Sequence, residues 1–401
     1  MLRFVPPAGV PLKMTQVLRA LRTALSLNGN DAAECLTSVA ALLRVRYVLG
    51  VSSGRAALWL VLRSLHRLQP ERDVVALPAY TCFSVPASVV RAGLKIHPLD
   101  IDPHTLDFDL SQLDELPEKR LLCIVTSNLF GFVNDLPRIR QAAQAKGAFV
   151  LDDAAQALGS MRNGRFAGTL GDVGVFSLDR GKALAAMEGG LIVTDSDEIA
   201  RIVQAEAKNL QTPSSADGAR LLFEMLVYTI LLRPSLYWIP NSLPFLKLGT
   251  TEFNPAFSTE RLHPLCQALL SQLLGGLAEM NRVRRSNARV ITEALAGNPD
   301  FEFPKPAPDS EPTFVRLPIV ARDKATRERA VSRLRGAGIG ASSFYPSAIC
   351  DITRIAPHMS VVDFHRKQAE LLSERLLTLP VNPMVRPQDL ERMASILTTL
   401  S

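Results

Sequence analysis

The 401-residue sequence lacks the features that would place it in several specialised classes of protein. Its five cysteines are odd in number and irregularly spaced, so they form neither a disulfide framework nor a metal-binding pattern and predict a reducing compartment. Tandem repeats and low-complexity tracts are also missing. Prolines in the first residues, MLRFVPPAGVPLKM, interrupt the apolar core that a signal peptide needs. We therefore expect a cytoplasmic protein without a metal site.

Long uncharged apolar runs and blocks of basic residues are absent as well. The most apolar stretch, Leu221 to Ile239, contains Glu224, Arg233 and Pro234, which disfavours a membrane-spanning helix. The formal net charge of +6 is spread along the chain without the Lys/Arg block of a nucleic-acid-binding arm. We expect no nucleic-acid partner; if the charge has a purpose, phosphates and nucleotides suit it better than DNA does.

The chain does have an ordinary globular composition, with 47% hydrophobic and 21% charged residues. Apolar strands alternate with amphipathic helices between residues 47 and 194, which predicts an α/β fold with a mainly parallel sheet covered by helices on both faces. We expect a large domain over residues 1–250, with amino-terminal helices over Thr15 to Leu27 and Asp31 to Arg44 and an apolar insertion near 220–250. Residues 251–401 should form a linking helix over Leu265 to Asn287 and a smaller α+β domain with a strand around Thr313 to Ile319.

Candidate catalytic residues gather between Phe149 and Thr194, at the ends of predicted strands. One strand ends in Asp152 and Asp153, and open α/β sheets bind ligands at this end of their strands. The next strand carries Ser177 and is followed by Lys182. Pyridoxal phosphate needs such a set: a lysine that bonds to its aldehyde carbon, a carboxylate for its ring nitrogen, and donors for its phosphate.

Each of these side chains also has a purely structural interpretation. An aspartate at a strand end often caps a helix, and the alanine-rich run after Asp152 fits that role. A lysine near glycines, such as Lys182, is typical of a solvated loop, and Ser177 could be a satisfied strand hydroxyl. The combination of all of them in one order favours the cofactor site.

The motifs DDAAQALGS, GDVGVFSLDRGK and EGG resemble the DegT and StrS sugar aminotransferases, a family of fold-type I pyridoxal phosphate enzymes. The resemblance implies an aspartate aminotransferase-like fold in which Asp153 pairs with the pyridine nitrogen and Gln156 lies near the phenolic oxygen. Ser177 would bind the phosphate and Lys182 the aldehyde. The resemblance also implies a homodimer in which Asn254, in EFNPAF, reaches the phosphate of the neighbouring subunit.

Some positions depart from the family pattern. In the turn before the predicted helix SSGRAALWLVLRSL, Gly54 matches, but Arg55 replaces the phosphate-binding threonine and could bind the phosphate or a substrate anion. Cys82 replaces the aromatic residue that stacks on the cofactor ring. The stack would then come from neighbouring aromatic residues, Tyr80 or Phe83, or be missing. Asn128 replaces a histidine, which alters substrate contacts or satisfies backbone groups.

The resemblance implies an aminotransferase that moves an amino group from an amino acid, expected to be glutamate, to a keto sugar linked to a nucleotide. Cell-surface polysaccharide and secondary-metabolite pathways use such products. Two alternatives remain: a lipid-linked or otherwise hydrophobic keto substrate lodged against Leu221 to Phe245, and a non-catalytic scaffold or regulatory relative. The apolar segment itself could form interior packing or a dimer interface, line an acceptor site, or contact a membrane surface. The presence of Lys182 disfavours the family's dehydrating branch, which has a histidine there.

Overall fold

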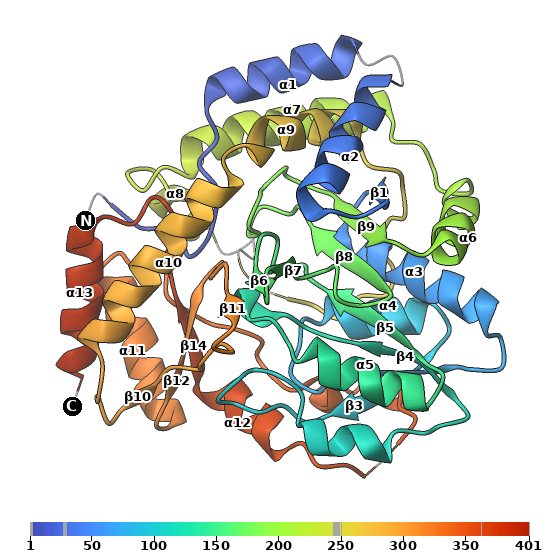
Figure 1. Cartoon of the computed structure of the whole chain (residues 1–401). Helices are drawn as coiled ribbons and strands as arrows, with labels where there is room; N and C mark the ends of the chain where they lie inside the picture. The colour runs from blue at the N-terminus through green and yellow to red at the C-terminus, as the bar shows by residue number, and fades with distance from the viewer. Residues whose placement is uncertain (1–2, 27–29, 244–248, 250, 362, 401) are drawn as a thin grey trace.

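The computed structural model describes residues 3–26, 30–243, 249, 251–361 and 363–400, and its largest element is a seven-stranded sheet (Figure 1). All of its strands run in one direction except β9, which is antiparallel to both of its neighbours. The predicted mainly parallel α/β sheet is thus confirmed. In spatial order the strands are β1 (Tyr47–Val51), β9 (Gly190–Thr194), β8 (Val173–Ser177), β5 (Phe149–Asp153), β4 (Leu121–Val125), β2 (Val74–Pro78) and β3 (Lys95–Leu99).

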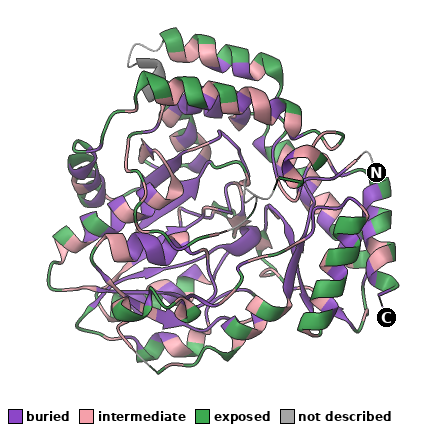
Figure 2. Ribbon diagram, turned by 180° about the vertical axis from the view of Figure 1, so that it is seen from behind, coloured by how far each residue is buried: buried purple, intermediate pink, exposed green. Residues whose placement is uncertain are grey.

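Helices cover both faces of this sheet, which is why its central strands are apolar on both sides. Every residue of β2, β4, β8 and β9 is buried. Figure 2 shows the buried sheet between helices whose outer faces are exposed. One face packs against α3 (Gly54–Leu68), α4 (Ser84–Arg91) and α6 (Asp197–Ala207), and the other against α1 (Met14–Ser26), α2 (Asn30–Leu43), α5 (Leu136–Ala145) and α9 (Pro264–Leu274).

A smaller antiparallel sheet forms a second core near the carboxyl terminus. Its strands are β10 (Phe301–Glu302), β12 (Leu317–Ala321), β14 (Leu376–Leu379) and β13 (Ser342–Ser343), in that order. It packs with α10 (Leu277–Ala294), α11 (Lys324–Gly336), α12 (Lys367–Arg375) and α13 (Pro387–Thr398). This is the expected α+β part of the chain, while the boundary between residues 250 and 251 stays a prediction.

Two sequence-based boundaries in this region were wrong. The helix expected over Leu265 to Asn287 is divided into α9 and α10 at Gly275 and Gly276, because adjacent glycines weaken a helix. The strand expected from Thr313 starts only at Leu317. Phe314 has a φ of 46°, which is incompatible with a strand, and the Thr313 amide donates to Ser160 Oγ at 3.0 Å.

Short elements connect the two sheets. β6 (Met161–Arg162) and β7 (Arg165–Phe166) form a hairpin that pairs with β11 (Ser310–Glu311). This pairing joins a loop of the large sheet to the segment before β12. Short 3₁₀ turns occur at η1 (Leu110–Glu115), η2 (Leu129–Gly131), η4 (Ile349–Asp351) and η5 (Ala356–His358).

The apolar insertion contains α7 (Ser215–Leu231) and α8 (Trp238–Asn241). A capping box of Ser214 and Asp217 starts α7, which packs beside α1 and α9. Leu221 and Met225 are buried in the main core, so part of the segment serves interior packing. Residues 244–248, where the predicted hydrophobic wall ends, lie outside the described residues, as does Leu27 at the end of the expected first helix.

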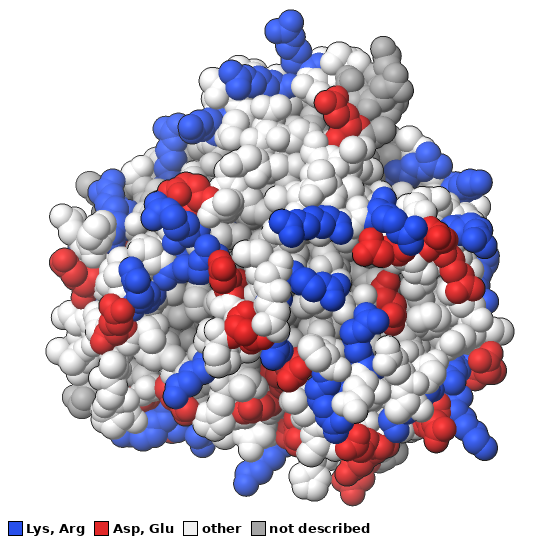
Figure 3. All heavy atoms as spheres, viewed as in Figure 1, with Lys and Arg blue, Asp and Glu red and all other residues white. Residues whose placement is uncertain are grey.

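Charge and hydropathy add two observations on the surface. Basic and acidic side chains are interspersed over the face shown in Figure 3, without a separate block of either sign. Within the described ranges, no helix combines the length and the hydropathy needed to cross a membrane.

Candidate active site

The candidate site lies at the carboxyl ends of β5 and β8, which are neighbours in the sheet. Asp153 is the last residue of β5 and Ser177 the last of β8, with Asp153 paired in register with Val175. The amino terminus of α3 lies against Ser177, because a Cβ built on Gly54 would be 3.0 Å from Ser177 Cβ. The sheet topology therefore brings Asp153, Ser177 and Gly54 to one edge.

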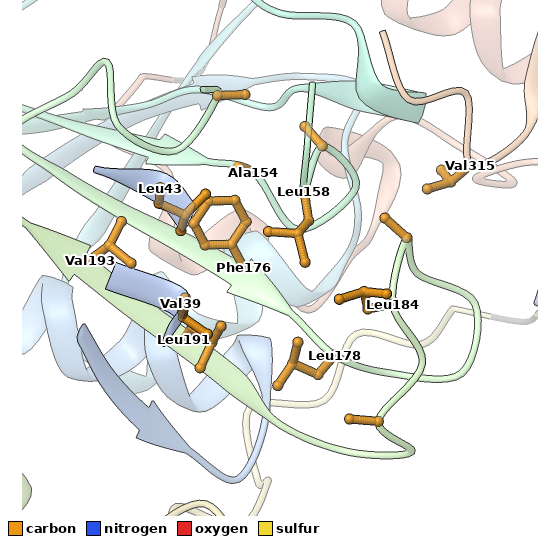
Figure 4. Packing of buried hydrophobic residues seen from close by; sticks show 14 of the residues in the cluster. Val39, Leu43, Ala154, Leu158, Phe176, Leu178, Leu184, Leu191, Val193 and Val315 are labelled. Carbon is orange, nitrogen blue, oxygen red and sulfur yellow. The ribbon is translucent and has the colours of Figure 1, made fainter. Parts of the chain in front are cut away.

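Lys182 projects from a loop that is fixed to the core. Leu178, Leu184 and Met187 on this loop are fully buried, and Figure 4 shows Leu178 and Leu184 packed beside the strands. The Lys182 amide donates to the Asp179 carbonyl at 3.0 Å. This burial is not that of a freely solvated loop, so the backbone that carries Lys182 is held in one position.

Helix α10 is hydrogen-bonded to the same loop. Arg284 is 1% exposed and donates from Nη2 to the Ala183 carbonyl at 3.0 Å and from Nη1 to Asn281 Oδ1 at 2.6 Å. Asn281 Nδ2 in turn donates to the Leu158 carbonyl at 3.2 Å. Two adjacent side chains of one helix thus hold the loop of Lys182 and the loop that follows β5.

The two consecutive aspartates at the end of β5 have different roles. Asp152 accepts hydrogen bonds from the Gly168 amide at 2.7 Å, the Leu170 amide at 3.2 Å and Asn128 Nδ2 at 2.7 Å. Its oxygens are therefore used within the protein. The Asp153 carboxylate accepts from the Ala155 amide at 2.9 Å. Asp153 has the acceptor capacity left over to bind a ligand.

Electrostatics connect Asp153 to Lys182. Burial raises the pKa of Asp153 to about 6, while the Ala155 amide and the positive charge of Lys182 act in the opposite direction. The lysine is thus close enough to act on the carboxylate across the strand ends. A buried, incompletely paired carboxylate beside a lysine is an arrangement found at functional sites.

Gln156 and Tyr345 close the site from the side of the smaller sheet. Gln156 Nε2 donates to the Tyr345 hydroxyl at 2.8 Å, and its Oε1 accepts from the Phe130 amide at 3.1 Å. Tyr345 is buried, and burial raises the pKa of its hydroxyl. Sequence reasoning missed this role of Tyr345; its local signal was the pair Tyr345-Pro346 after a glycine-containing turn, and its partner is 189 positions away.

Comparison with known proteins assigns this arrangement to a family. The model of the DegT/DnrJ/EryC1/StrS aminotransferase family matches residues 11–398. The chain belongs to this family. It is a pyridoxal phosphate-dependent aminotransferase family enzyme, as the motifs around Asp153 and Lys182 predicted.

Individual relatives agree with this assignment over most of their length. The chain is 26% identical to the UDP-N-acetyl-3-dehydro-alpha-D-glucosamine 3-aminotransferase of Acidithiobacillus ferrooxidans, over 96% of this chain and 92% of the relative. It superposes on the sugar aminotransferase CalS13 of Micromonospora echinospora with a TM-score of 0.79 at 22% identity, covering 98% of this chain and 99% of that one. The E. coli GDP-4-keto-6-deoxy-D-mannose-3-dehydratase with bound hydrated PLP gives a TM-score of 0.79 at 20% identity, covering 99% of this chain and 100% of that one. These superpositions confirm the aspartate aminotransferase-like fold.

The residues of this family member fit the cofactor. Gly54 leaves space between the start of α3 and Ser177 that a Cβ would reduce, and Ser53 caps the helix by accepting from the Ala56 amide at 3.1 Å. The first N–H groups of a helix have no partner within it and favour an anion such as a phosphate. At the other end of the site, Asp153 is buried with unused acceptor capacity, as a protonated ring nitrogen requires.

Three departures from the family pattern can now be interpreted. Asn128 satisfies other groups, because its Nδ2 also donates to the Asp153 carbonyl at 2.8 Å and its Oδ1 accepts from the Asn134 amide at 3.0 Å. The Arg55 guanidinium lies over the Phe257 ring at 5.5 Å. The guanidinium charge therefore lies near the segment that carries Phe257 and Asn254.

The third departure concerns the ring that would stack on the cofactor. Tyr80 is fully buried and donates to the Phe344 carbonyl, and Phe83 is buried in the core beneath α4. Cys82 is half-buried, with its Sγ 3.3 Å from Ser84 Oγ. Both aromatic neighbours thus have packing roles within the chain, and the ring that would stack on the cofactor stays a prediction.

Asn254 makes a local hydrogen bond within one chain. It is exposed, and its Oδ1 accepts from the Ala256 amide at 2.9 Å to form a local turn. Among the residues that the structure describes, its side chain makes no hydrogen bond to Asp153, Ser177 or Lys182. Its family role toward a neighbouring subunit stays a prediction.

Proposed function

We propose that this family member transfers an amino group from glutamate to a keto sugar linked to a nucleotide, in a pathway to a cell-surface polysaccharide or a secondary metabolite. The observation that carries the proposal is the placement of Lys182 beside the buried Asp153 at the strand ends of a family fold. The named activity of the Acidithiobacillus relative, on a nucleotide-linked keto sugar, supports this substrate class.

In this proposal, Lys182 and Asp153 carry the chemistry. Bound pyridoxal phosphate would supply an electron sink for the substrate carbon that loses its proton. Lys182 would hold the cofactor at rest and, once displaced by the amino donor, move a proton as general base and acid. The Asp153 carboxylate would keep the ring nitrogen protonated, because a buried carboxylate strongly favours a nearby positive charge.

The remaining residues would orient the cofactor. Gln156 would direct its amide toward the phenolic oxygen, while the Ser177 hydroxyl and the amide groups at Gly54 and Arg55 would bind the phosphate. The Arg55 guanidinium would add positive charge there or contact a substrate anion. Asn254 would complete the phosphate site of a second subunit, which makes a homodimer the proposed working form.

The proposal is tested with pure protein, pyridoxal phosphate, glutamate and a panel of nucleotide-linked keto sugars. We expect 2-oxoglutarate and an aminated sugar to form in equal amounts, with Lys182→Ala inactive. Lys208→Ala, in an exposed part of the chain after α6, is the matched control and should retain full activity. Binding of the cofactor without amination of any nucleotide-linked sugar in the panel would contradict the substrate class.

A hydrophobic acceptor is a second candidate because the insertion exposes large apolar side chains. Phe223 is 67% exposed, Ile230 45% and Trp238 44%, all on α7 and α8. Such side chains could cover the apolar part of a lipid-linked keto sugar. Phe223→Ser should then raise KM for a lipid-linked acceptor and leave KM for a soluble nucleotide sugar unchanged. If the variant and the parent have the same KM for the lipid-linked acceptor, this candidate is excluded.

A further inference from the structure

The large apolar side chains that the structure leaves exposed gather on three neighbouring helices. Leu25 is 81% exposed and Phe223 67%. In the described part of the chain, all of the exposed large hydrophobic side chains except Val290 lie on α1, on α7, or on and just after α8: Met14, Leu18, Leu25, Phe223, Ile230, Trp238 and Leu243. Single apolar residues are normal on a protein surface, but a cluster of this kind marks a contact site.

Helix α7 is apolar on the side that faces away from the core. Phe223 and Ile230 are two helical turns apart and therefore lie on one face of the helix. The opposite face is buried through Leu221, Met225 and Thr229. A helix at a protein surface normally has polar residues on its outer face, so the outer face of α7 is suited to an apolar partner rather than to water.

The three helices form one surface because contacts within the chain fix their relative positions. Helix α1 lies beside α7 in both Figure 1 and Figure 2. Just before α1, the Val10 amide donates to the Tyr228 hydroxyl of α7 at 3.2 Å. The Phe4 amide donates to the Pro234 carbonyl, between α7 and α8, at 2.7 Å. We call the seven exposed side chains on or just after these three helices the apolar face.

Positive charge without a counter-charge borders the apolar face. Lys13, Arg19 and Arg22 are exposed on or directly before α1, whose sequence contains no acidic residue. Arg233 is exposed between α7 and α8, and the exposed Arg335 donates to the last residue of α8 at 3.4 Å. Among the described residues, none of these five side chains pairs with a carboxylate.

The acidic residues of α7 do not offset this charge, because they have partners of their own. Glu224 lies 3.0 Å from Arg220 and 3.5 Å from Arg180. Asp217 accepts from the Ser214 amide at 2.9 Å in the capping box. The surface around the apolar face is therefore positive.

We propose that the apolar face binds the surface of an anionic lipid bilayer. Its apolar side chains insert at the boundary between headgroups and acyl chains, and the basic side chains around it contact lipid phosphates. Trp238 is of the residue type that this boundary favours. A second copy of the chain fits less well, because a two-fold contact would place the two positive borders against each other. The inference goes beyond the proposed function and does not depend on it.

Flotation of the pyridoxal phosphate-loaded protein with lipid vesicles tests the inference. The vesicles consist of phosphatidylcholine alone or of equimolar phosphatidylcholine and phosphatidylglycerol, without any sugar lipid that could bind as an acceptor. We expect the protein to float with the mixed vesicles only, and less as the salt concentration rises, because salt screens the attraction. Equal binding to both kinds of vesicle, or binding to neither, overturns the inference whether or not the protein is active as an aminotransferase.

A double substitution on α1 tests the basic border. Arg19→Gln combined with Arg22→Gln should weaken binding to the mixed vesicles by roughly 10- to 30-fold, since each basic residue at an anionic surface contributes a factor of roughly five. The matched control is Arg282→Gln combined with Arg289→Gln, two exposed arginines of α10 whose loss changes the net charge equally. Equal losses in both double variants would mean attraction by net charge alone and would overturn the assignment to this face.

A single substitution on α7 tests the apolar contact. Phe223→Ser should weaken binding to the mixed vesicles by roughly 10-fold, because less apolar area leaves water. Val290→Ser, at a 43% exposed position on α10, is the control and should bind as the parent does. Bound cofactor absorbance shows that both variants fold. Parental affinity of Phe223→Ser would contradict insertion of the apolar face.

Trp238 reports which face meets the bilayer. The chain has two tryptophans, so Trp59→Phe leaves Trp238 as the only one. We expect its emission to shift to shorter wavelength on the mixed vesicles and to be quenched by brominated acyl chains. Flotation without quenching would assign binding to another face. Dimers that Phe223→Ser dissociates in solution, together with no vesicle binding by the parent, would assign the apolar face to a second copy. Either result overturns the inference.

Discussion

The two aspartates at the end of β5 show how adjacent residues of one type acquire different functions. Asp152 accepts hydrogen bonds from Asn128 and from the loop that precedes β8, whereas Asp153 is buried with one accepted hydrogen bond. Sequence spacing did not separate them; the resemblance to the family did, and the hydrogen bonds give the physical reason. Burial raises the pKa of both carboxyls, but only Asp152 would lose several hydrogen bonds on substitution, so the same change at each position should have opposite effects on stability.

Asp153→Asn should stabilise the cofactor-free protein at pH 7. The pKa of Asp153 rises from 3.8 to about 6 on folding, so the folded state binds its proton more tightly than the unfolded chain does. Stability is therefore lost as the pH rises from about 4 to about 6, and the shift corresponds to about 3 kcal/mol. We expect a gain of about 1 to 3 kcal/mol for the variant in urea unfolding at pH 7, together with weaker cofactor binding.

Asp152→Asn is the control for that experiment. It should destabilise the protein by about 1 to 3 kcal/mol, since one oxygen would become an amide that faces the Gly168 and Leu170 amides or Asn128. If both variants shift the free energy of unfolding in the same direction, the different roles assigned to the two carboxylates are wrong.

At the scale of elements, the site depends on how closely the start of α3 approaches the end of β8. Gly54→Ala would bring a Cβ to 3.0 Å from Ser177 Cβ and 3.3 Å from Ser177 Oγ, so the hydroxyl would have to move. We expect roughly 10-fold weaker binding of pyridoxal phosphate in a fluorescence titration, equivalent to about 1.4 kcal/mol. Gly181→Ala, beside Lys182, meets no atom within 4 Å and should leave the affinity unchanged.

Helix α10 should determine the order of the loop that carries Lys182. Arg284→Lys removes at least one of the buried hydrogen bonds to Ala183 and Asn281, at an expected cost of about 1 to 3 kcal/mol. Hydrogen exchange of the loop amides should accelerate in parallel. Arg282→Lys, on the exposed side of the same helix, pairs with Glu279 and should change neither quantity. Unchanged exchange in Arg284→Lys would contradict the clamping role.

Elements with a strong local signal were the ones that the sequence predicted well. The buried strands and α1 to α3 were expected within a few residues, because apolar periodicity and caps are local. The late start of β12 and the contact of Tyr345 were not, because they depend on hydrogen bonds to Ser160 and Gln156, more than a hundred residues away. The division between α9 and α10 does have a local signal, the pair Gly275-Gly276, which the prediction of one long helix overlooked.

At the scale of the whole molecule, Asn254 is exposed, and the resemblance to the family predicts that it acts on a neighbouring subunit. If the homodimer forms as proposed, each site contains Lys182 from one chain and Asn254 from the other. Mixing inactive Lys182→Ala with weakened Asn254→Ala should then produce hybrid dimers with one complete site each. We expect the activity of the mixture to exceed the mean of the two parents after subunit exchange.

Sedimentation of the same mixture checks that hybrid dimers form. The two variants carry different labels, and both labels should sediment together in one dimer. Hybrid dimers whose activity equals the mean of the two parents would contradict a shared site. A monomer with full activity would exclude the proposed dimeric site altogether.

The central claim is that Lys182 holds pyridoxal phosphate in this fold. Reduction of the loaded protein with borohydride makes the bond between lysine and cofactor permanent, and peptide mass mapping then locates it. We predict the cofactor mass on the peptide that contains Lys182, loss of that label in Lys182→Ala, and loss of it when glutamate is added before reduction. A label on another lysine, or none on the parent protein, would contradict the account.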